Sequence, residues 1–203
     1  MEFYIQYEGR LPSQNSKDKE NRRVETHRIR RHFHSQLLRL WNDRFGALAG
    51  LPPRRTPGLN EHRRRYLEAK SLAVKDTEFI VLPIVTKSEN LVCGLDISLY
   101  RNDRPGSFVG PSGDLDNRLK VLFDAMTIPN ASQLDGLAPE QGERPLFCLL
   151  EDDALIVDLR IQAVQLWTTV NSPEEKHEFK VAVKVKVSST EFAGYGVAAL
   201  PDI

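Results

Sequence analysis

The chain has 203 residues, 40% of them hydrophobic, and its 28 basic and 28 acidic residues give a formal net charge of +0. It can bury the core of one domain, 1–203. It contains no apolar run that would span a bilayer and no signal peptide, so we expect a cytoplasmic protein. Cys93 and Cys148 lack His or Cys neighbours at zinc spacing, which argues against a zinc site and favours reduced, buried thiols.

The zero net charge conceals two unequal parts of the chain. Residues 1–75 contain 17 Lys and Arg against 8 Asp and Glu, and residues 76–203 contain 11 against 20. This asymmetry is expected if the first part meets phosphate while the second holds cations. Pairing of the two parts within the molecule would give the same counts, so charge alone leaves both explanations open.

The first elements are a strand, FYIQY near the start, and a basic helical region, 24–75. Helical spacing from Val24 to about Phe45 predicts a helix whose apolar stripe is Ile29, Phe33, Leu37, Leu40, Trp41 and Phe45. The arginines expected to contact DNA phosphates are Arg28, Arg31 and Arg39 on the opposite side of this helix, and Arg63, Arg64 and Arg65 before a second short helix. For any single arginine, a solvated helix face remains the alternative.

Four histidines lie in the same region: His27, His32, His34 and His62. No H-E-x-x-H pattern accompanies them, so a surface or phosphate-facing position is favoured over a catalytic role.

Four more strands are predicted, at FIVLPIVT from Phe79, LVCGLDISLY from Leu91, LIVDLRIQA from Leu155 and FKVAVKVKV from Phe179. The strands from Phe79 and Leu91 adjoin through the turn KSEN and are expected to form a hairpin. A mixed sheet of about five strands with two or three helices packed on it defines an α+β fold. The Gly-rich segment NDRPGSFVGPSG lacks the lysine of a P-loop and is expected to form a flexible lip, and the tail 191–203 is weakly patterned.

The most informative segment is GDLDNRLKVLFDAM, residues 113–126. Asp114 and Asp116 lie where a glycine-containing turn becomes an amphipathic helix, whose polar stripe continues through Lys120 and Asp124. Mg²⁺ takes oxygen ligands and often needs only one or two carboxylates, so these side chains are a candidate cation site. The alternative is an N-cap at Asp116 with an ordinary ion pair to Lys120.

A second acidic step, Asp152 and Asp153, opens the strand from Leu155, and its carboxylates can face the helix across a shallow cleft. In this strand apolar and polar residues alternate. Between helix and strand lies an inserted loop, 127–151, whose prolines and glycines predict irregular structure. Its apolar end, Pro145 to Leu150, is expected to pack back, and the loop is a candidate docking site for a protein partner.

The order D-x-D-N, then x-x-K, then x-x-x-D-A, then D-D before a strand resembles the RusA-type Holliday junction resolvases. The resemblance covers 114–161 and implies a homodimeric, Mg²⁺-dependent DNA endonuclease, with Mn²⁺ as a substitute, acting on Holliday junctions or related branched DNA. It places the essential acids at Asp114, Asp116 and Asp153, with Asp152 beside them, and the charge-stabilising lysine at Lys120. Asn117 of the same motif is expected to contact DNA.

Two departures mark the chain as a divergent member: Ala154 and Leu155 replace a glutamine that follows the D-D step in the family, and the loop 127–151 replaces a short connection. They motivate an alternative, a catalytically inactive RusA-like DNA-binding or interaction module whose acidic residues only pair structurally.

Overall fold

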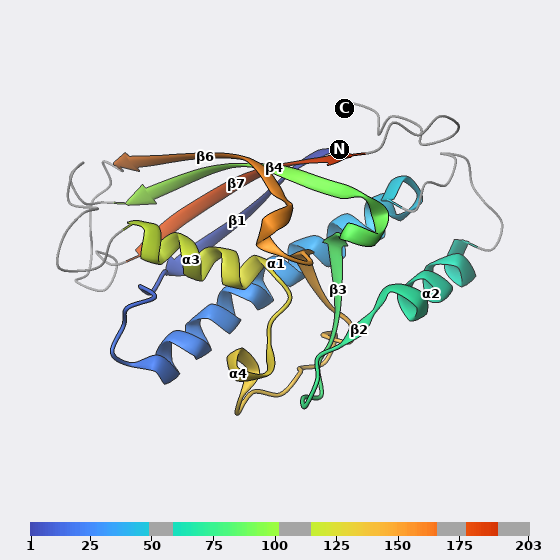
Figure 1. Cartoon of the computed structure of the whole chain (residues 1–203), viewed down its shortest axis with the longest axis horizontal. Helices are drawn as coiled ribbons and strands as arrows, with labels where there is room; N and C mark the ends of the chain where they lie inside the picture. The colour runs from blue at the N-terminus through green and yellow to red at the C-terminus, as the bar shows by residue number, and fades with distance from the viewer. Residues whose placement is uncertain (49–58, 102–114, 166–177, 191–203) are drawn as a thin grey trace.

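The computed structural model describes residues 1–48, 59–101, 115–165 and 178–190 (Figure 1). Its helices are α1 (Lys19–Leu48), α2 (Leu59–Lys70), α3 (Leu115–Met126) and α4 (Ala131–Leu134), with 3-10 turns η1 (Lys87–Glu89) and η2 (Asp153–Leu155). The strands are β1 (Glu2–Arg10), β2 (Leu72–Ala73), β3 (Ile80–Val85), β4 (Leu91–Arg101), β5 (Leu146–Leu150), β6 (Ile156–Gln165) and β7 (Glu178–Ser189). The α+β class is confirmed, and all five predicted strands form.

Four of these strands build the larger sheet, in the order β1-β7-β4-β6. β7 pairs antiparallel with β1 and β4, whereas β6 joins β4 in parallel. Alternating residues of β7, from Val181 to Val187, are buried on the face that α1 and α3 cover, because a strand with one buried face places every second side chain in the core (Figure 1). The opposite face carries polar side chains, among them Lys180 and Lys184.

The remaining strands form a second sheet, β2-β3-β5, rather than extending the first. The hairpin predicted between β3 and β4 is therefore wrong: η1 and the left-handed Asn90 (φ 54°) turn the chain sharply, but the two strands enter different sheets. β3 instead pairs in parallel with β5. Five consecutive residues of β3 are buried, as expected for a strand covered on both faces.

The inserted segment 127–151 is not the irregular loop that was expected. Asn130 and Gln133 form a reciprocal capping box at the start of α4, and the apolar run Leu146–Leu150 is a fully buried strand, β5. The segment packs back as predicted, but it does so as part of a sheet.

α1 begins five residues before the predicted start, where the Asp18 carboxylate accepts a hydrogen bond from the Asn21 amide at 2.9 Å. Cys93 and Cys148 are free and buried, as predicted. None of the helices in the described ranges combines the length and apolarity needed to cross a bilayer. The predicted lip, Asp114 and the tail 191–203 lie outside the described residues.

Candidate acidic site and its surroundings

α3 separates an apolar face from a charged one, as its sequence predicts. Leu119, Leu122 and Met126 are buried, while Asp116 and Lys120 are exposed with 3.8 Å between the Asp116 Oδ2 and the Lys120 Nζ. An exposed ion pair at this distance contributes at most about 1 kcal/mol, so neither charge is strongly held by the other. Both groups therefore remain available to a ligand.

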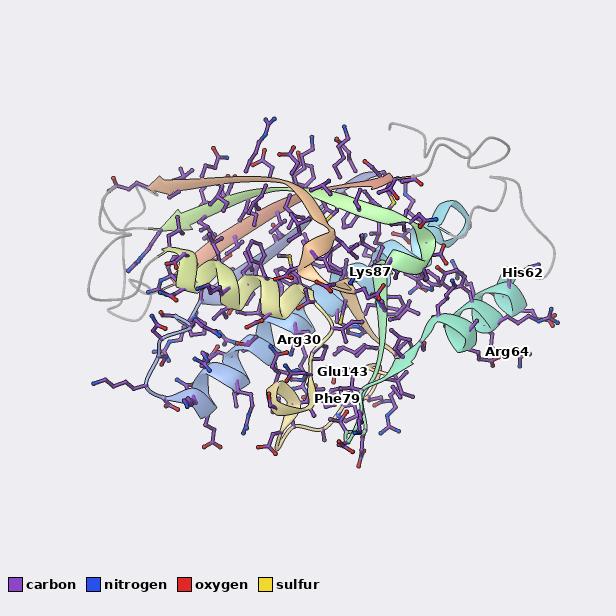
Figure 2. The ribbon with its side chains drawn as sticks, in the orientation of Figure 1. Arg30, His62, Arg64, Phe79, Lys87 and Glu143 are labelled. Atoms are coloured by element: carbon purple, nitrogen blue, oxygen red, sulfur yellow. The ribbon has the colours of Figure 1, made fainter. Side chains whose placement is uncertain are left out.

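The acidic step before β6 divides into a structural residue and an exposed one. Asp152 caps η2 by accepting a hydrogen bond from the Ala154 amide at 3.0 Å, and its Oδ2 lies 2.8 Å from the Lys87 Nζ (Figure 2). The hydrogen bond from Lys87 is the main reason that the pKa of Asp152 is lowered. Asp153 is exposed beside it.

Asp124 is the half-buried carboxylate of the polar stripe on α3. Burial raises the pKa of the Asp124 carboxyl, the charge of Arg30 opposes this shift, and the charge of Asp153 adds a smaller increase. Asp116 lies eight residues, or about 12 Å of helix axis, from Asp124. Across the described ranges no three His, Cys, Asp or Glu residues converge closely enough to hold a metal ion. Since Asp114 is not described, a site formed by Asp114, Asp116 and Asp153 stays a prediction.

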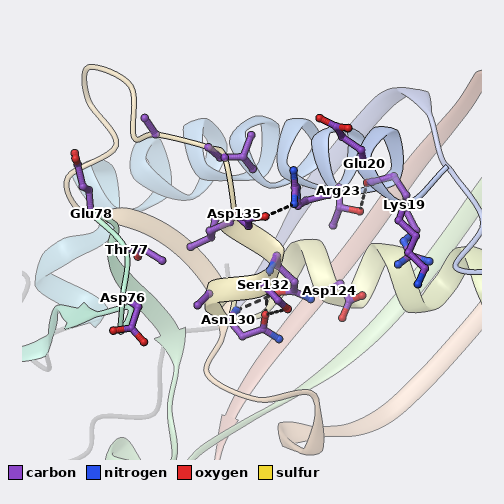
Figure 3. A pocket seen from close by; sticks show the side chains of 18 of the residues that line it. Lys19, Glu20, Arg23, Asp76, Thr77, Glu78, Asp124, Asn130, Ser132 and Asp135 are labelled. Carbon is purple, nitrogen blue, oxygen red and sulfur yellow. Dashed lines mark hydrogen bonds and ion pairs between the residues drawn. The ribbon is translucent and has the colours of Figure 1, made fainter.

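A groove of about 1270 Å³ runs past Asp124, between the start of α1, α4 and the turn from β2 to β3 (Figure 3). The charged residues of its lining are three basic and five acidic: Lys19, Arg22, Arg23, Glu20, Asp76, Glu78, Asp124 and Asp135. The acidic excess favours cations over bare phosphate in this groove.

Behind Asp124, α1 contributes a buried arginine that sequence reasoning missed. Arg30 is 1% exposed, and its Nη2 donates a hydrogen bond to the Asp124 carbonyl oxygen at 2.6 Å (Figure 2). Its Nη1 lies 3.4 Å from the His27 Nδ1. Burial, followed by the charge of Arg30, lowers the pKa of His27 to about 3. His27 is therefore neutral at pH 7, and its Nδ1 can accept from the guanidinium.

The surface position predicted for His27 and His34 is wrong. His34 is buried, and its Nδ1 accepts a hydrogen bond from the Phe147 amide of β5 at 2.9 Å, while the His27 ring packs edge-on against Phe79. Residues 27, 30 and 34 form a second buried stripe on α1, beside the predicted apolar one. Their i, i+3, i+7 spacing places these polar residues on one side of the helix, but spacing alone did not reveal that this side is buried. His32 and His62 are exposed, as predicted.

Two arginines of the first helix that were expected to contact DNA, Arg28 and Arg31, form ion pairs within the molecule. The Arg31 guanidinium lies 2.6 Å from a Glu140 carboxylate oxygen and 2.7 Å from one of Glu143, and it donates to the Ala138 carbonyl. Arg28 is paired with Glu25 at 3.0 Å. For Arg31, the alternative explanation that the basic and acidic parts of the chain pair within the molecule is therefore correct. Arg31 links α1 to the inserted segment, and its partner Glu143 is labelled in Figure 2.

Two α2 arginines that were expected to contact DNA are more accessible than Arg31 of α1. The side chains of Arg64 and Arg65 are exposed, and among the described residues their acidic partners are Glu68 and Glu61 of the same helix, at 3.8 and 2.5 Å. Arg64 projects away from the body of the protein in Figure 2. Arg63 donates to the Asn42 carbonyl of α1, and the Trp41 and Tyr66 rings, 5.1 Å apart, pack the two helices together.

Two other residues predicted to contact DNA differ in exposure. Arg39 is exposed and lies 3.9 Å from Asp43, so its guanidinium can reach a ligand. Asn117 is 8% exposed, so little of its side chain reaches the surface, and its contact with DNA stays a prediction. Its backbone carbonyl accepts a hydrogen bond from the Gln14 amide at 3.1 Å, so this residue helps to fix the chain before α1 against α3.

No protein-family model and no curated protein matches the sequence. The resemblance to the RusA-type resolvases therefore rests on the motif residues alone and stays a prediction.

Proposed function

We propose that the protein is a Mg²⁺-dependent, structure-selective endonuclease that hydrolyses phosphodiesters in Holliday junctions or related branched DNA. The observation that carries the proposal is a line of charges along α3. Asp116, Lys120 and Asp124 follow one another at i, i+4 spacing, and Asp153 acts electrostatically on the last of them. Alternating carboxylates and a lysine suit a phosphodiester backbone that approaches together with divalent cations.

The chain supplies the donor types that such a reaction needs. Asp114, Asp116 and Asp153 are hard oxygen ligands, and bound Mg²⁺ or Mn²⁺ would activate water and stabilise charge on the leaving oxygen. Asp116 belongs to the first turn of α3, where the positive end of the helix dipole attracts negative charge. Lys120 holds a positive charge one turn further along and stabilises the negative charge that develops on the phosphate. Asp152 contributes less to metal binding because Lys87 already neutralises it.

DNA binding is assigned to the exposed arginines. Arg64, Arg65 and Arg39 carry accessible guanidinium groups, and each phosphate that they neutralise adds a salt-dependent increment to affinity. A homodimer with two equivalent sites would match the two-fold symmetry of a four-way junction. A cytoplasmic location belongs to the same proposal.

The alternative is a RusA-like module that binds branched DNA or a protein without cutting. Two observations favour it: the described residues contain no convergent group of three metal ligands, and Asp152 is occupied by Lys87. In this alternative the acidic residues contribute only to local pairing.

Cleavage assays on four-way junctions, splayed duplexes and linear duplex, with Mg²⁺, Mn²⁺ or a chelator, test the proposal. We expect metal-dependent cleavage of the branched substrates. Asp116→Asn and Lys120→Ala should reduce it by roughly 100-fold or more while junction binding persists. The matched control is Glu8→Gln, an exposed carboxylate of β1 that is paired with Lys180. If the folded protein cuts none of these substrates, the enzyme proposal fails, and junction binding without cutting would support the alternative.

A further inference from the structure

β6 is an edge strand with an unusual number of exposed apolar side chains. It pairs with β4 on one side, and none of the strands in the described ranges pairs with its other side (Figure 1). Val157, Leu159 and Ile161 are 66%, 43% and 36% exposed. Edge strands of monomeric proteins are usually protected by lysines, prolines or bulges, because exposed edges invite pairing with another chain. β6 contains neither lysine nor proline, and its register shift against β4, at Val157, leaves Leu159 and Ile161 in regular pairing.

These apolar side chains continue the surface of the core. In the parallel register with β4, Leu159 is opposite Leu95 and Ile161 is opposite Ile97, and both β4 residues are buried. Residues opposite each other in a sheet point to the same face, so the buried apolar row extends onto β6. The alternate residues, Asp158 and Arg160, point to the polar face of the sheet.

The sequence of this segment is complementary to itself. If a second β6 lies antiparallel with Leu159 at the two-fold axis, Leu159 faces its own equivalent, Val157 faces Ile161, and Asp158 faces Arg160. Apolar and opposite-charge pairs across strands both stabilise a sheet. Centring the pair on Asp158 or on Arg160 instead would place identical charges opposite each other. Charge complementarity thus selects a single register.

We propose that the outer edge of β6 binds a second copy of this chain by antiparallel strand addition, which joins the two larger sheets through Leu159. Such a contact is isologous and closes after two copies, so it produces a dimer rather than a fibre. This inference does not depend on nuclease activity, because it rests on the edge strand alone. A catalytically inactive protein would still form the dimer.

Charge reversal tests the register through the oligomeric state, measured by sedimentation equilibrium at micromolar concentrations. The wild-type protein should be a dimer. Asp158→Arg places arginines opposite each other at two positions and should yield a monomer, whereas Asp158→Arg combined with Arg160→Asp restores opposite charges and should restore the dimer. Asp43→Arg, the same charge change on the exposed surface of α1, should leave the dimer unchanged.

Engineered thiols test the same register by a second route. Leu159→Cys should form a covalent dimer on oxidation, because residues facing each other across antiparallel strands lie within disulfide range. In Val157→Cys the two thiols would be four residues apart along the strand, roughly 13 Å, and should not link. The native thiols of Cys93 and Cys148 are buried, so the wild-type protein shows how much linking occurs without an engineered thiol. A monomeric wild-type protein, or equal linking of both variants, would overturn the proposal, and circular dichroism verifies that each variant is folded.

Discussion

The arginines of α1 and α2 come from equally basic stretches of the chain but lie in different surroundings. Arg31 of α1 contacts Glu140, Glu143 and a backbone carbonyl of the inserted segment, whereas Arg64 of α2 has only a distant partner on its own helix. Arg31 stabilises the contact between α1 and the inserted segment, whereas Arg64 is exposed to solvent. A basic count in the sequence therefore predicts positive charge but not whether it serves stability or binding.

The acidic residues outside α1 that pair with its arginines come from the acidic part of the chain, residues 76–203. Asp135, Glu140 and Glu143 belong to residues 127–151, and the first of them pairs with Arg23 of α1 at 2.9 Å. The opposite charges of the two parts thus meet at α1 within the molecule. Since no acidic residue of the inserted segment is paired with Arg64 or Arg65 in the described structure, α2 retains accessible positive charge.

The largest stability effect is expected at Arg30, the most buried arginine of α1. Arg30→Met removes the donor to the Asp124 carbonyl, together with the positive charge that most strongly opposes the raised pKa of the half-buried Asp124 carboxyl. Breaking such a buried arrangement should lower the free energy of unfolding by about 3–5 kcal/mol. Urea denaturation measures this, with Arg39→Met, an exposed α1 arginine, as a control that should change it by less than about 0.5 kcal/mol. Equal effects at the two positions would refute the distinction.

A smaller loss is expected at Arg31. Arg31→Ala leaves the Glu143 carboxylate, whose side chain is 6% exposed, without its guanidinium partner. We expect about 2–3 kcal/mol of destabilisation, less than for a fully buried pair because Arg31 is partly exposed. Adding Glu143→Gln should recover part of this loss in a double-mutant cycle, since it removes the unpaired charge. Arg64→Ala, the α2 counterpart, should cost less than about 0.5 kcal/mol.

The buried histidine next to Arg30 makes stability depend on pH. His27 has a pKa of about 3 in the folded protein and an ordinary value of 6.5, so between these values the unfolded chain binds the additional proton. Stability contributed by the neutral ring is complete above pH 6.5 and falls as the pH decreases, by about 2 kcal/mol between pH 7 and pH 5. His27→Gln should flatten this dependence in urea titrations, whereas His62→Gln, on the exposed surface of α2, should leave it unchanged. A wild-type slope retained in the His27 variant would contradict the assignment.

The smallest effect on stability, and a specific effect on binding, is expected on α2. Arg64→Ala combined with Arg65→Ala should leave the unfolding free energy within about 1 kcal/mol of wild type. The salt dependence of junction binding, as log K against log salt, should become shallower by about 2, because two phosphate contacts are lost. Arg144→Ala removes an equally exposed, ion-paired arginine from the inserted segment and should not alter the slope. An unchanged slope in the α2 variant would remove α2 from the DNA-binding surface.

Two patterns of apolar residues predicted much of the fold: alternation along strands, and a spacing of three to four residues along helices. The alternating valines of β7 and the separation of Leu119 and Leu122 from Asp116 and Lys120 on α3 required only local spacing. β5 could not be recognised in the same way, because the five consecutive apolar residues between Pro145 and Glu151 carry no alternation. Its parallel partner β3 lies far away in the sequence, so the second sheet is a tertiary property.

Only part of the candidate site could be predicted from the sequence. The exposed pair of Asp116 and Lys120 follows from helical spacing, whereas the position of Asp153 depends on the turn η2 between β5 and β6, which helical or strand spacing does not predict. Arg30 was not singled out because one arginine among several on a helix has no signature of burial. Its spacing with His27 and His34 becomes informative only once β5 is known to cover that side.

The central claim is that acidic side chains of α3 and η2 bind the catalytic cation, and a crystal soaked in Mn²⁺ tests it most directly. Anomalous diffraction should give a density peak with carboxylate oxygens of Asp116 and Asp153 among its ligands, at about 2 Å. Diffraction that shows no Mn²⁺ peak coordinated by these carboxylates would contradict the claim.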